Sequence, residues 1–447
     1  TCRKRQRPRL SRWISSAMLP LCSAVSSALA PLEQAAPAGA ALQPASTAPH
    51  VEAYTTTGWH EERVSFASAA AACLGSAANP VNGSQSKTRS STSLVAWDGT
   101  MPNAFKSKFM DFGDCSSRID VPDGLVDAVS HQTRPHIIIA GLGDSGTRGV
   151  RDLMDAVGVG MCSCTNPSMD NNLSFPVHDC VDNLLAGGNG VVSMKAFMKA
   201  EEPWERTLRA MKASMLLTGE CARRTSRRAS PHSVWGYKSQ RHIYLVPVIQ
   251  HALASLSGPR TLMLLVSRDP RDICTGKVHG AAGAETEMLE RAYGYDGSSC
   301  LGWYSAMWTS MLPELGGDAF QDSAAASLAI VRIEDLVVPV PEKGSTSEHI
   351  LKCIMRRVHL APSHRKKIQG GLAMMHAYRT SYLGMGGHGN ERHLTNIGNG
   401  VESHTEMHGV MQQLGYKVDE YGLDEPASAR VITPECKGEN MRRHTKN

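Results

Sequence analysis

A short run of large apolar side chains that ends in a glycine-rich loop constrains the fold of this chain more than any other feature. Residues 136–140 read His-Ile-Ile-Ile-Ala, a β-branched run bounded by Pro135 and Gly141, which is typical of a buried parallel strand. After the loop, residues 147–157 carry apolar side chains at helical spacing, and Gly158 ends the pattern. A strand, a glycine loop and a helix in this order predict an α/β domain.

Further apolar segments of both kinds follow along the chain. Residues 261–266 and 329–333 are predicted strands, and residues 203–217, 243–255 and 301–315 are predicted helices. This alternation predicts a three-layer α/β fold, in which a mostly parallel sheet has helices on both faces and a P-loop-like phosphate-binding loop at one strand end.

Composition indicates how much of the chain folds. Only 5% of the 447 residues are aromatic. Residues 1–30 are basic, then moderately apolar, and end in small side chains, which predicts a signal-like or transit-like segment, with a weak membrane anchor as the alternative. Residues 31–103 are rich in Ala, Pro and Ser and are expected to form a linker or stem. The folded domain is predicted over 104–427, followed by a basic polar tail over 428–447.

The charge of the chain argues against nucleic acid as a partner. The formal net charge is +5, but six of the 47 basic residues lie in the first twelve positions and no acid precedes Glu33. The remaining 41 basic residues are balanced by 42 acidic ones, so the domain has no excess of positive charge for a nucleic-acid surface.

The cysteines and the N-glycosylation sequons bear on the cellular compartment in which the chain folds. Apart from Cys162 and Cys164, the twelve cysteines are dispersed singly, and no Cys/His set has zinc spacing, so no metal site is predicted. We expect mainly buried thiols, with a few disulfides if the chain is secretory. Sequons at Asn82 and Asn172 are compatible with that compartment.

The glycine loop, residues 141–149, reads Gly-Leu-Gly-Asp-Ser-Gly-Thr-Arg-Gly and has chemistry suited to an anion at a helix N-terminus. It contains GxGxxG, but the dinucleotide interpretation needs an acid at the end of a second strand. The candidate strand, 157–164, lacks one, and the next acid is Asp170. A Walker A loop needs lysine after the last motif glycine, where Thr147 stands. A tight turn without a ligand is a further alternative.

A third interpretation comes from the segments that follow. The strand over 261–266 runs into Ser-Arg-Asp-Pro-Arg-Asp, which resembles the second signature of the PAPS-dependent sulfotransferases (PAPS is 3′-phosphoadenosine 5′-phosphosulfate). Four other segments resemble motifs of that family in the family's order: Ser-Gly-Thr at 145–147, Trp-Gly-Tyr-Lys at 235–238, Arg-Ile-Glu-Asp-Leu within 331–336 and Leu-Gly-Tyr at 414–416. The resemblance covers roughly residues 135–420.

The resemblance implies a set of nucleotide-binding residues. In the loop, the backbone of Gly143, Asp144, Ser145, Gly146 and Thr147 would hold the 5′-phosphate, and Arg148 would partly replace the lysine that many members carry where Asp144 stands. Further along the chain, the set includes Arg268, Thr275 and His388.

The roles of these later residues also follow from the resemblance. Arg268 would pair with the 3′-phosphate. The family serine eight positions after this arginine falls on Gly276, with Thr275 beside it, and His388 lies in a glycine-rich loop that would close over the nucleotide. Lys238 would stabilise the leaving oxygen.

Three residues are candidates for the base that receives the acceptor's proton: His242, Asp144 and Asp170. The predicted catalytic pair consists of Lys238 and His242.

The expected activity is therefore sulfuryl transfer from PAPS, as co-substrate, to an acceptor hydroxyl. Resemblance to secretory members suggests a carbohydrate acceptor and the Golgi lumen, with a plastid or other organelle as the alternative location. The competing functions are a Rossmann-type NAD(P)-dependent oxidoreductase and a catalytically silent nucleotide-binding protein, which the departures at Asp144 and Gly276 would suit. The identity of the acceptor and the oligomeric state stay open.

Overall fold

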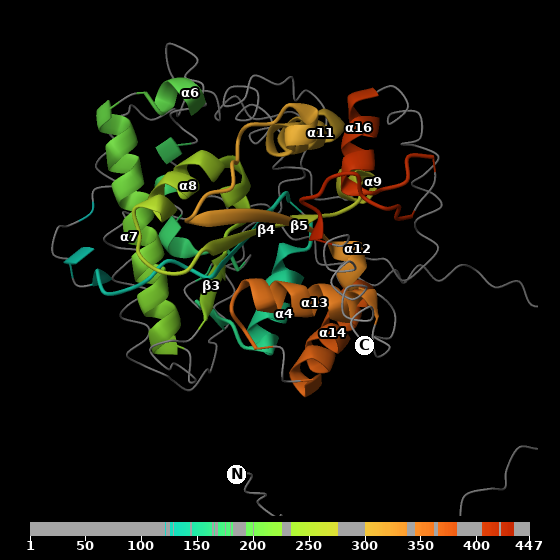
Figure 1. Ribbon diagram of the computed structural model, residues 1–447, viewed down its shortest axis with the longest axis horizontal. Coiled ribbons are helices and arrows are strands. Elements are labelled where there is room, and N and C mark those ends of the chain that lie inside the picture. Colours follow the sequence, from blue (N-terminus) through green and yellow to red (C-terminus); the bar gives the residue numbers. More distant parts are fainter. Residues whose placement is uncertain are drawn as a thin grey trace, which may run out of the picture. The chain divides into compact units, whose positions relative to one another are not determined.

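The computed structural model describes residues 121–432 apart from 122–125, 128, 144, 163–164, 166–168, 175, 179, 182–193, 200, 226–233, 276–299, 338–344, 362–364, 382–404 and 420–421. Its centre is a five-stranded sheet in the order β2-β3-β1-β4-β5, in which every pairing is parallel (Figure 1). The strands are β1 (Ile137–Gly141), β2 (Gly160–Met161), β3 (Trp235–Lys238), β4 (Thr261–Ser267) and β5 (Ala326–Arg332).

The strands are buried on both faces, as their continuous apolar sequences require. In β1, Ile138 packs into one hydrophobic cluster, whereas its neighbours Ile137 and Ile139 pack into a second cluster on the opposite face. This alternation follows from the two-residue period of a strand. Each face therefore needs its own layer of helices.

Helices cover both faces and make three layers (Figure 1). One face packs against α4 (Thr147–Val157), α13 (Thr346–Arg357) and α14 (Arg365–Ser381). The other packs against α7 (Glu201–Thr225), α8 (Val246–Ala254), α11 (Cys300–Met311) and α16 (Thr405–Leu414). The shorter helices are η3 (Asn172–Ser174), α6 (Met194–Phe197), η4 (Gln240–Tyr244), α9 (Pro270–Thr275), η6 (Pro313–Leu315) and α12 (Ile333–Leu336).

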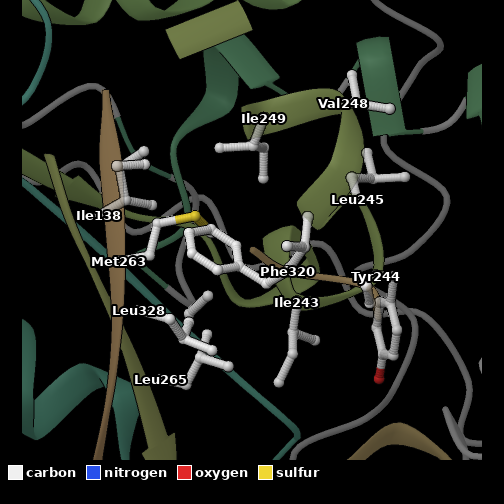
Figure 2. Packing of buried hydrophobic residues seen from close by; sticks show 14 of the residues in the cluster. Ile138, Ile243, Tyr244, Leu245, Val248, Ile249, Met263, Leu265, Phe320 and Leu328 are labelled. Atoms are coloured by element: carbon white, nitrogen blue, oxygen red, sulfur yellow. The ribbon is translucent and has the colours of Figure 1, made fainter. Parts of the chain in front are cut away.

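Figure 2 shows how the second of these faces is packed. Ile138, Met263, Leu265 and Leu328 project from the strands toward a group of side chains on η4 and α8. The labelled members of that group are Ile243, Tyr244, Leu245, Val248 and Ile249, and Phe320 lies between the two sets. All of these side chains are 4% exposed or less, so the residues just after β3 are anchored by core packing.

The α/β fold with a parallel sheet is confirmed, and the predicted elements differ from it mainly in their bounds. The first strand and the helix over 147–157 match β1 and α4 closely. The helix predicted over 203–217 is longer at both ends, and the one predicted over 243–255 begins as the separate turn η4. The strand expected within 157–164 is reduced to the two residues of β2. Predicted segments 1–30 and 31–103 lie outside the described residues.

The cysteines show two states. Cys180 and Cys353 are disulfide-bonded, whereas Cys162 and Cys221 are buried thiols. Cys164 and the sequon at Asn82 lie outside the described residues, and Asn172 lies in η3. Within the described ranges, every helix is too short or too polar to span a bilayer.

Candidate functional site

Three of the predicted features lie at one edge of the sheet: the glycine loop after β1, Lys238 at the end of β3 and Arg268 just after β4. Because all strands are parallel, the ends of β1, β3, β4 and β5 lie along the same edge, with Gly141 opposite Val266 and Ser267 opposite Arg332. After β1 the chain turns toward β2, and after β4 it turns the opposite way, toward β5. In open α/β sheets, ligands bind outside the strand ends where adjacent strands diverge in this way.

The glycine loop closes tightly over the end of β1. A Cβ on Gly141 would lie 2.6 Å from Ser145 Oγ and 2.7 Å from the carbonyl oxygen of Val266 on β4. Gly146, the residue before α4, has φ +91°, a conformation that favours glycine, and a Cβ there would lie 2.8 Å from Ile333 Cγ1. These two contacts explain why the loop needs glycine at both positions.

The loop presents polar groups for which the protein supplies few partners. Among the described residues, no side chain caps the N-terminus of α4, and its first turn carries no acid. Ser145 is only 1% exposed, yet its Oγ has no hydrogen-bond partner within the described part of the chain. Thr147 is buried beside it, and Arg148 is half-buried. An oxyanion near the helix N-terminus would provide an acceptor for the Ser145 hydroxyl and for the N–H groups at the start of α4.

Lys238, at the end of β3, is paired with an acid from the loop after β2. Its Nζ lies 2.8 Å from Asp170 Oδ1, which also accepts a hydrogen bond of 2.6 Å from the backbone N–H of Gln240. The Lys238 side chain is 1% exposed, and burial lowers its pKa. Asp170 opposes this shift, whereas the charges of Arg148 and Arg151 add to it. The ammonium group therefore belongs to a cluster of cations beside the glycine loop.

His242 lies inside the protein, in a chain of hydrogen bonds. Its Nδ1 is 2.8 Å from His178 Nε2, and its Nε2 is 3.0 Å from the hydroxyl of Tyr237. The residue is fully buried, and this burial lowers the pKa of His242 to about 3. Both ring nitrogens of this predicted base are thus engaged within the core.

Arg268 follows β4 and is held close to the sheet edge. Its side chain is 10% exposed, and its Nη2 lies 3.6 Å from Asp272 Oδ2. The next arginine, Arg271, takes the other acid of the signature, with Nη2 2.6 Å and Nε 2.9 Å from the Asp269 carboxylate. The two arginines therefore differ in their distance from these acids, since Arg271 forms a short two-point pair with Asp269 whereas Arg268 lies farther from Asp272.

The later motifs meet at the ends of β4 and β5. The guanidinium of Arg332 pairs with Asp335 at 2.7 Å and donates to the carbonyl oxygens of Gly415 and, at 2.9 Å, of Asp424. These contacts tie the end of β5 to the turn after α16. Sequence reasoning placed these motifs in order but assigned no role to Arg332.

A second set of contacts, which we call the strand-end network, links the side chains of Ser267, Glu334 and Tyr416 to the backbone of Asp269. Glu334 accepts hydrogen bonds from the Asp269 N–H at 2.8 Å and from the Tyr416 hydroxyl at 3.1 Å. Ser267 Oγ is 2.7 Å from the same hydroxyl. Sequence reasoning assigned no role to Glu334 either, since its partners lie in distant segments.

Some predicted site residues fall outside the part of the chain that the structure describes. Asp144 and His388 lie outside the described residues, as does Gly276, and Thr275 is placed at the end of α9 by its backbone alone. In the described ranges, no group of three or more His, Cys, Asp or Glu is arranged to hold a metal ion.

Neither a protein-family model nor a curated protein matches this chain significantly.

Proposed function

We propose that this chain transfers a sulfuryl group from PAPS to an acceptor hydroxyl, with a carbohydrate as the acceptor class. The observation that carries the proposal is the sharing of one sheet edge by the glycine loop, Lys238 and Arg268. The buried Ser145 hydroxyl without a described partner fits a phosphate at the N-terminus of α4. Arg268, on the neighbouring strand end, supplies a guanidinium for a second anionic group of the same nucleotide.

In the proposed reaction, the acceptor oxygen attacks sulfur while the bond from sulfur to the bridging phosphate oxygen breaks. The products are the sulfated acceptor and adenosine 3′,5′-bisphosphate, and the acceptor proton passes to a base. Positioning and electrostatics carry most of such a reaction, so a cation that meets the leaving oxygen is important. Lys238 fills this role, because the charge that develops on the leaving oxygen would be stabilised by an ammonium group beside the loop.

Among the candidate bases, Asp170 is better placed than His242. Asp170 lies at hydrogen-bond distance from Lys238 and its side chain is 11% exposed, whereas His242 is fully buried with both nitrogens engaged. A base must reach the acceptor directly or through a water molecule. In this proposal, Asp170 is therefore the base that receives the proton of the acceptor hydroxyl.

The strand order favours this function over an NAD(P)-dependent oxidoreductase. In the Rossmann arrangement, the second strand lies next to the first and its terminal acid binds the ribose. Here β3 lies between β1 and β2, and the acid that follows β2, Asp170, is paired with Lys238.

The secretory pathway, with the Golgi lumen as the specific compartment, is part of the proposal. Disulfide bonds at Cys180 and Cys353 support it, because disulfides persist in oxidising compartments. Measured localisation of the tagged full-length chain would test this part separately.

Two variants test the assigned roles. Arg268→Ala should weaken adenosine bisphosphate binding about 10- to 150-fold, the loss of one charge-assisted hydrogen bond, and raise KM for PAPS more than it lowers kcat. Lys238→Met should lower kcat and kcat/KM together and change bisphosphate affinity little, because the charge it meets develops only as the bond breaks.

The control is Arg260→Ala, an exposed arginine just before the opposite end of β4, which should leave both constants unchanged. Calorimetry, steady-state rates and thermal unfolding of each variant provide the measurements. Parent-like bisphosphate affinity in Arg268→Ala would contradict the assignment of the second signature.

A further inference from the structure

The peptide group between Arg268 and Asp269 is held from both sides by side chains of different elements. The Tyr304 hydroxyl, on α11, donates to the carbonyl oxygen of Arg268 at 2.8 Å. The Glu334 carboxyl group, on α12, accepts from the N–H of Asp269 at 2.8 Å. Arg268, Asp269 and Tyr304 are buried, with 8% exposure or less, and Glu334 is half-buried. One peptide plane is thus fixed at both of its polar ends.

Fixing this plane restrains ψ of Arg268 and φ of Asp269, and therefore the path of the turn from which the Arg268 side chain projects. Rotation of the peptide group would break one or both hydrogen bonds. The strand-end network extends the restraint, because Glu334 is in turn bonded to Tyr416, and Tyr416 to Ser267, the last residue of β4. The turn is therefore held by α11, α12 and the segment after α16.

We propose that Glu334 is a positioning residue that fixes the turn carrying Arg268, and that it thereby sets the affinity of the site for the 3′-phosphate of the nucleotide. The second half of this inference rests on the proposed function, whereas the first rests on the described contacts alone. Glu334 does not itself face the nucleotide in this account. It acts through the Asp269 backbone.

The properties of the carboxyl group indicate which variant preserves the network. Burial raises the pKa of Glu334 to about 8, and the charges of Asp269 and Asp272 contribute to this, which favours the protonated form. In that form the carboxyl O–H is the donor in the contact with the Tyr416 hydroxyl, whereas the ionised form accepts from it. A glutamine can reproduce the neutral form: its carbonyl oxygen accepts from Asp269 N–H, and its amide donates to the Tyr416 hydroxyl, which can then donate to Ser267. Glu334→Gln should therefore behave like the parent, whereas Glu334→Ala should not.

Amide hydrogen exchange tests the positioning without any ligand. In Glu334→Ala, residues 267–273 should exchange faster than in the parent, and in Glu334→Gln they should exchange at the parent rate. Ser347→Ala is the matched control: it removes a buried hydrogen bond of 2.7 Å to the Asp335 carbonyl on α12 and does not touch the turn. Unchanged exchange in Glu334→Ala, or equal acceleration in Ser347→Ala, would overturn the inference.

A double-mutant cycle tests the consequence for binding. Glu334→Ala should weaken adenosine bisphosphate binding about tenfold in the parent and hardly at all when Arg268→Ala is already present, because the effect passes through Arg268. Equal losses in both backgrounds would overturn the link to Arg268. If the parent binds no bisphosphate, the proposed function and the link to the phosphate fail together, and the exchange experiment still decides whether Glu334 fixes the turn.

Discussion

At the end of β1, among the described residues, the buried Ser145 hydroxyl has no hydrogen-bond partner and no side chain caps the N-terminus of α4. At the ends of β4 and β5, by contrast, the side chains of Arg332, Glu334 and Tyr416 bond to other groups of the protein, although Arg268 Nε has no hydrogen-bond partner in the described part of the chain. We call the first region the loop half and the second, which includes Arg268 and the strand-end network, the clamp half. Both belong to the same sheet edge and are built from the same kind of strand end. The difference indicates that the loop half is suited to receive an anion, and that the clamp half is suited to hold a cation in place.

The largest effect is expected in the clamp half, from Arg332→Ala. This change removes the guanidinium that pairs with the buried Asp335 carboxylate and donates to the carbonyl oxygens of Gly415 and Asp424. Removing one partner of a buried ion pair costs about 3–5 kcal/mol. Chemical denaturation should show a loss of that size, while Arg260→Ala, whose pair with Asp322 is exposed, should change stability by less than about 1 kcal/mol. Equal losses of stability in Arg332→Ala and Arg260→Ala would contradict the view that the ion pair in the clamp half stabilises the fold more than an exposed pair does.

Next in size is a comparison of two glycines in the loop half. Gly141→Ala places a methyl group 2.7 Å from the backbone oxygen of Val266, so it should destabilise the protein by about 1–3 kcal/mol and displace the loop. Among the described residues, a methyl group in Gly143→Ala meets the end of the Gln240 side chain, at 3.3 Å, and should be tolerated. Thermal unfolding compares the two variants directly. Equal stability would mean that the loop is less tightly closed than the distances indicate.

A pH series examines the strand-end network. Because the pKa of Glu334 is raised from 4.5 to about 8 by burial, the folded state holds a proton that the unfolded state releases earlier. The contribution of this group to stability is complete below pH 4.5 and is lost as the pH rises toward 8, by up to about 1.4 kcal/mol per pH unit. The unfolding free energy of Glu334→Gln should therefore rise relative to the parent across this interval. Parallel curves would indicate that the carboxyl group is ionised in the folded protein.

The smallest effect on stability is expected from Ser145→Ala. Its hydroxyl has no hydrogen-bond partner in the described part of the chain, so its removal should change the unfolding free energy by less than about 1 kcal/mol. Affinity for adenosine bisphosphate should nevertheless fall about tenfold, since a bond to a charged group is lost. Ser305→Ala, which removes a comparably buried hydroxyl on α11, should leave affinity unchanged. Loss of stability without loss of affinity would show that the Ser145 hydroxyl serves the fold.

The parts of the fold that could be predicted are those with strong local patterns. The β-branched run of β1 and the glycines at both ends of α4 determine those elements almost completely. By contrast, β3 was noted only as a motif, because Trp-Gly-Tyr-Lys lacks a β-branched run and becomes a strand through pairing with β1 and β2. The two-residue β2 likewise depends on its partner rather than on its own sequence.

The part of the site that could be predicted from the sequence is the set of residues that directly follow predicted strands. Parallel strands bring their ends to one edge, so Arg268 could be placed at that edge from the sequence, whereas Lys238 belongs there because Trp-Gly-Tyr-Lys pairs as β3. The pairing of Lys238 with Asp170 depends on a contact between loops, and the burial of His242 depends on which side of η4 faces the core. Neither is encoded in local spacing, and the contacts of Glu334 likewise join three distant segments.

Binding of a nucleotide with phosphate groups at both the 3′ and 5′ positions to this sheet edge is tested most directly by the unfolding free energy of the chain. We would measure it in the presence of adenosine 3′,5′-bisphosphate, NAD or ATP. At 100 times its Kd, the bisphosphate should add about 2.7 kcal/mol, and the other two should add less at the same concentration. Stabilisation by NAD alone, or by none of the three, would contradict the account.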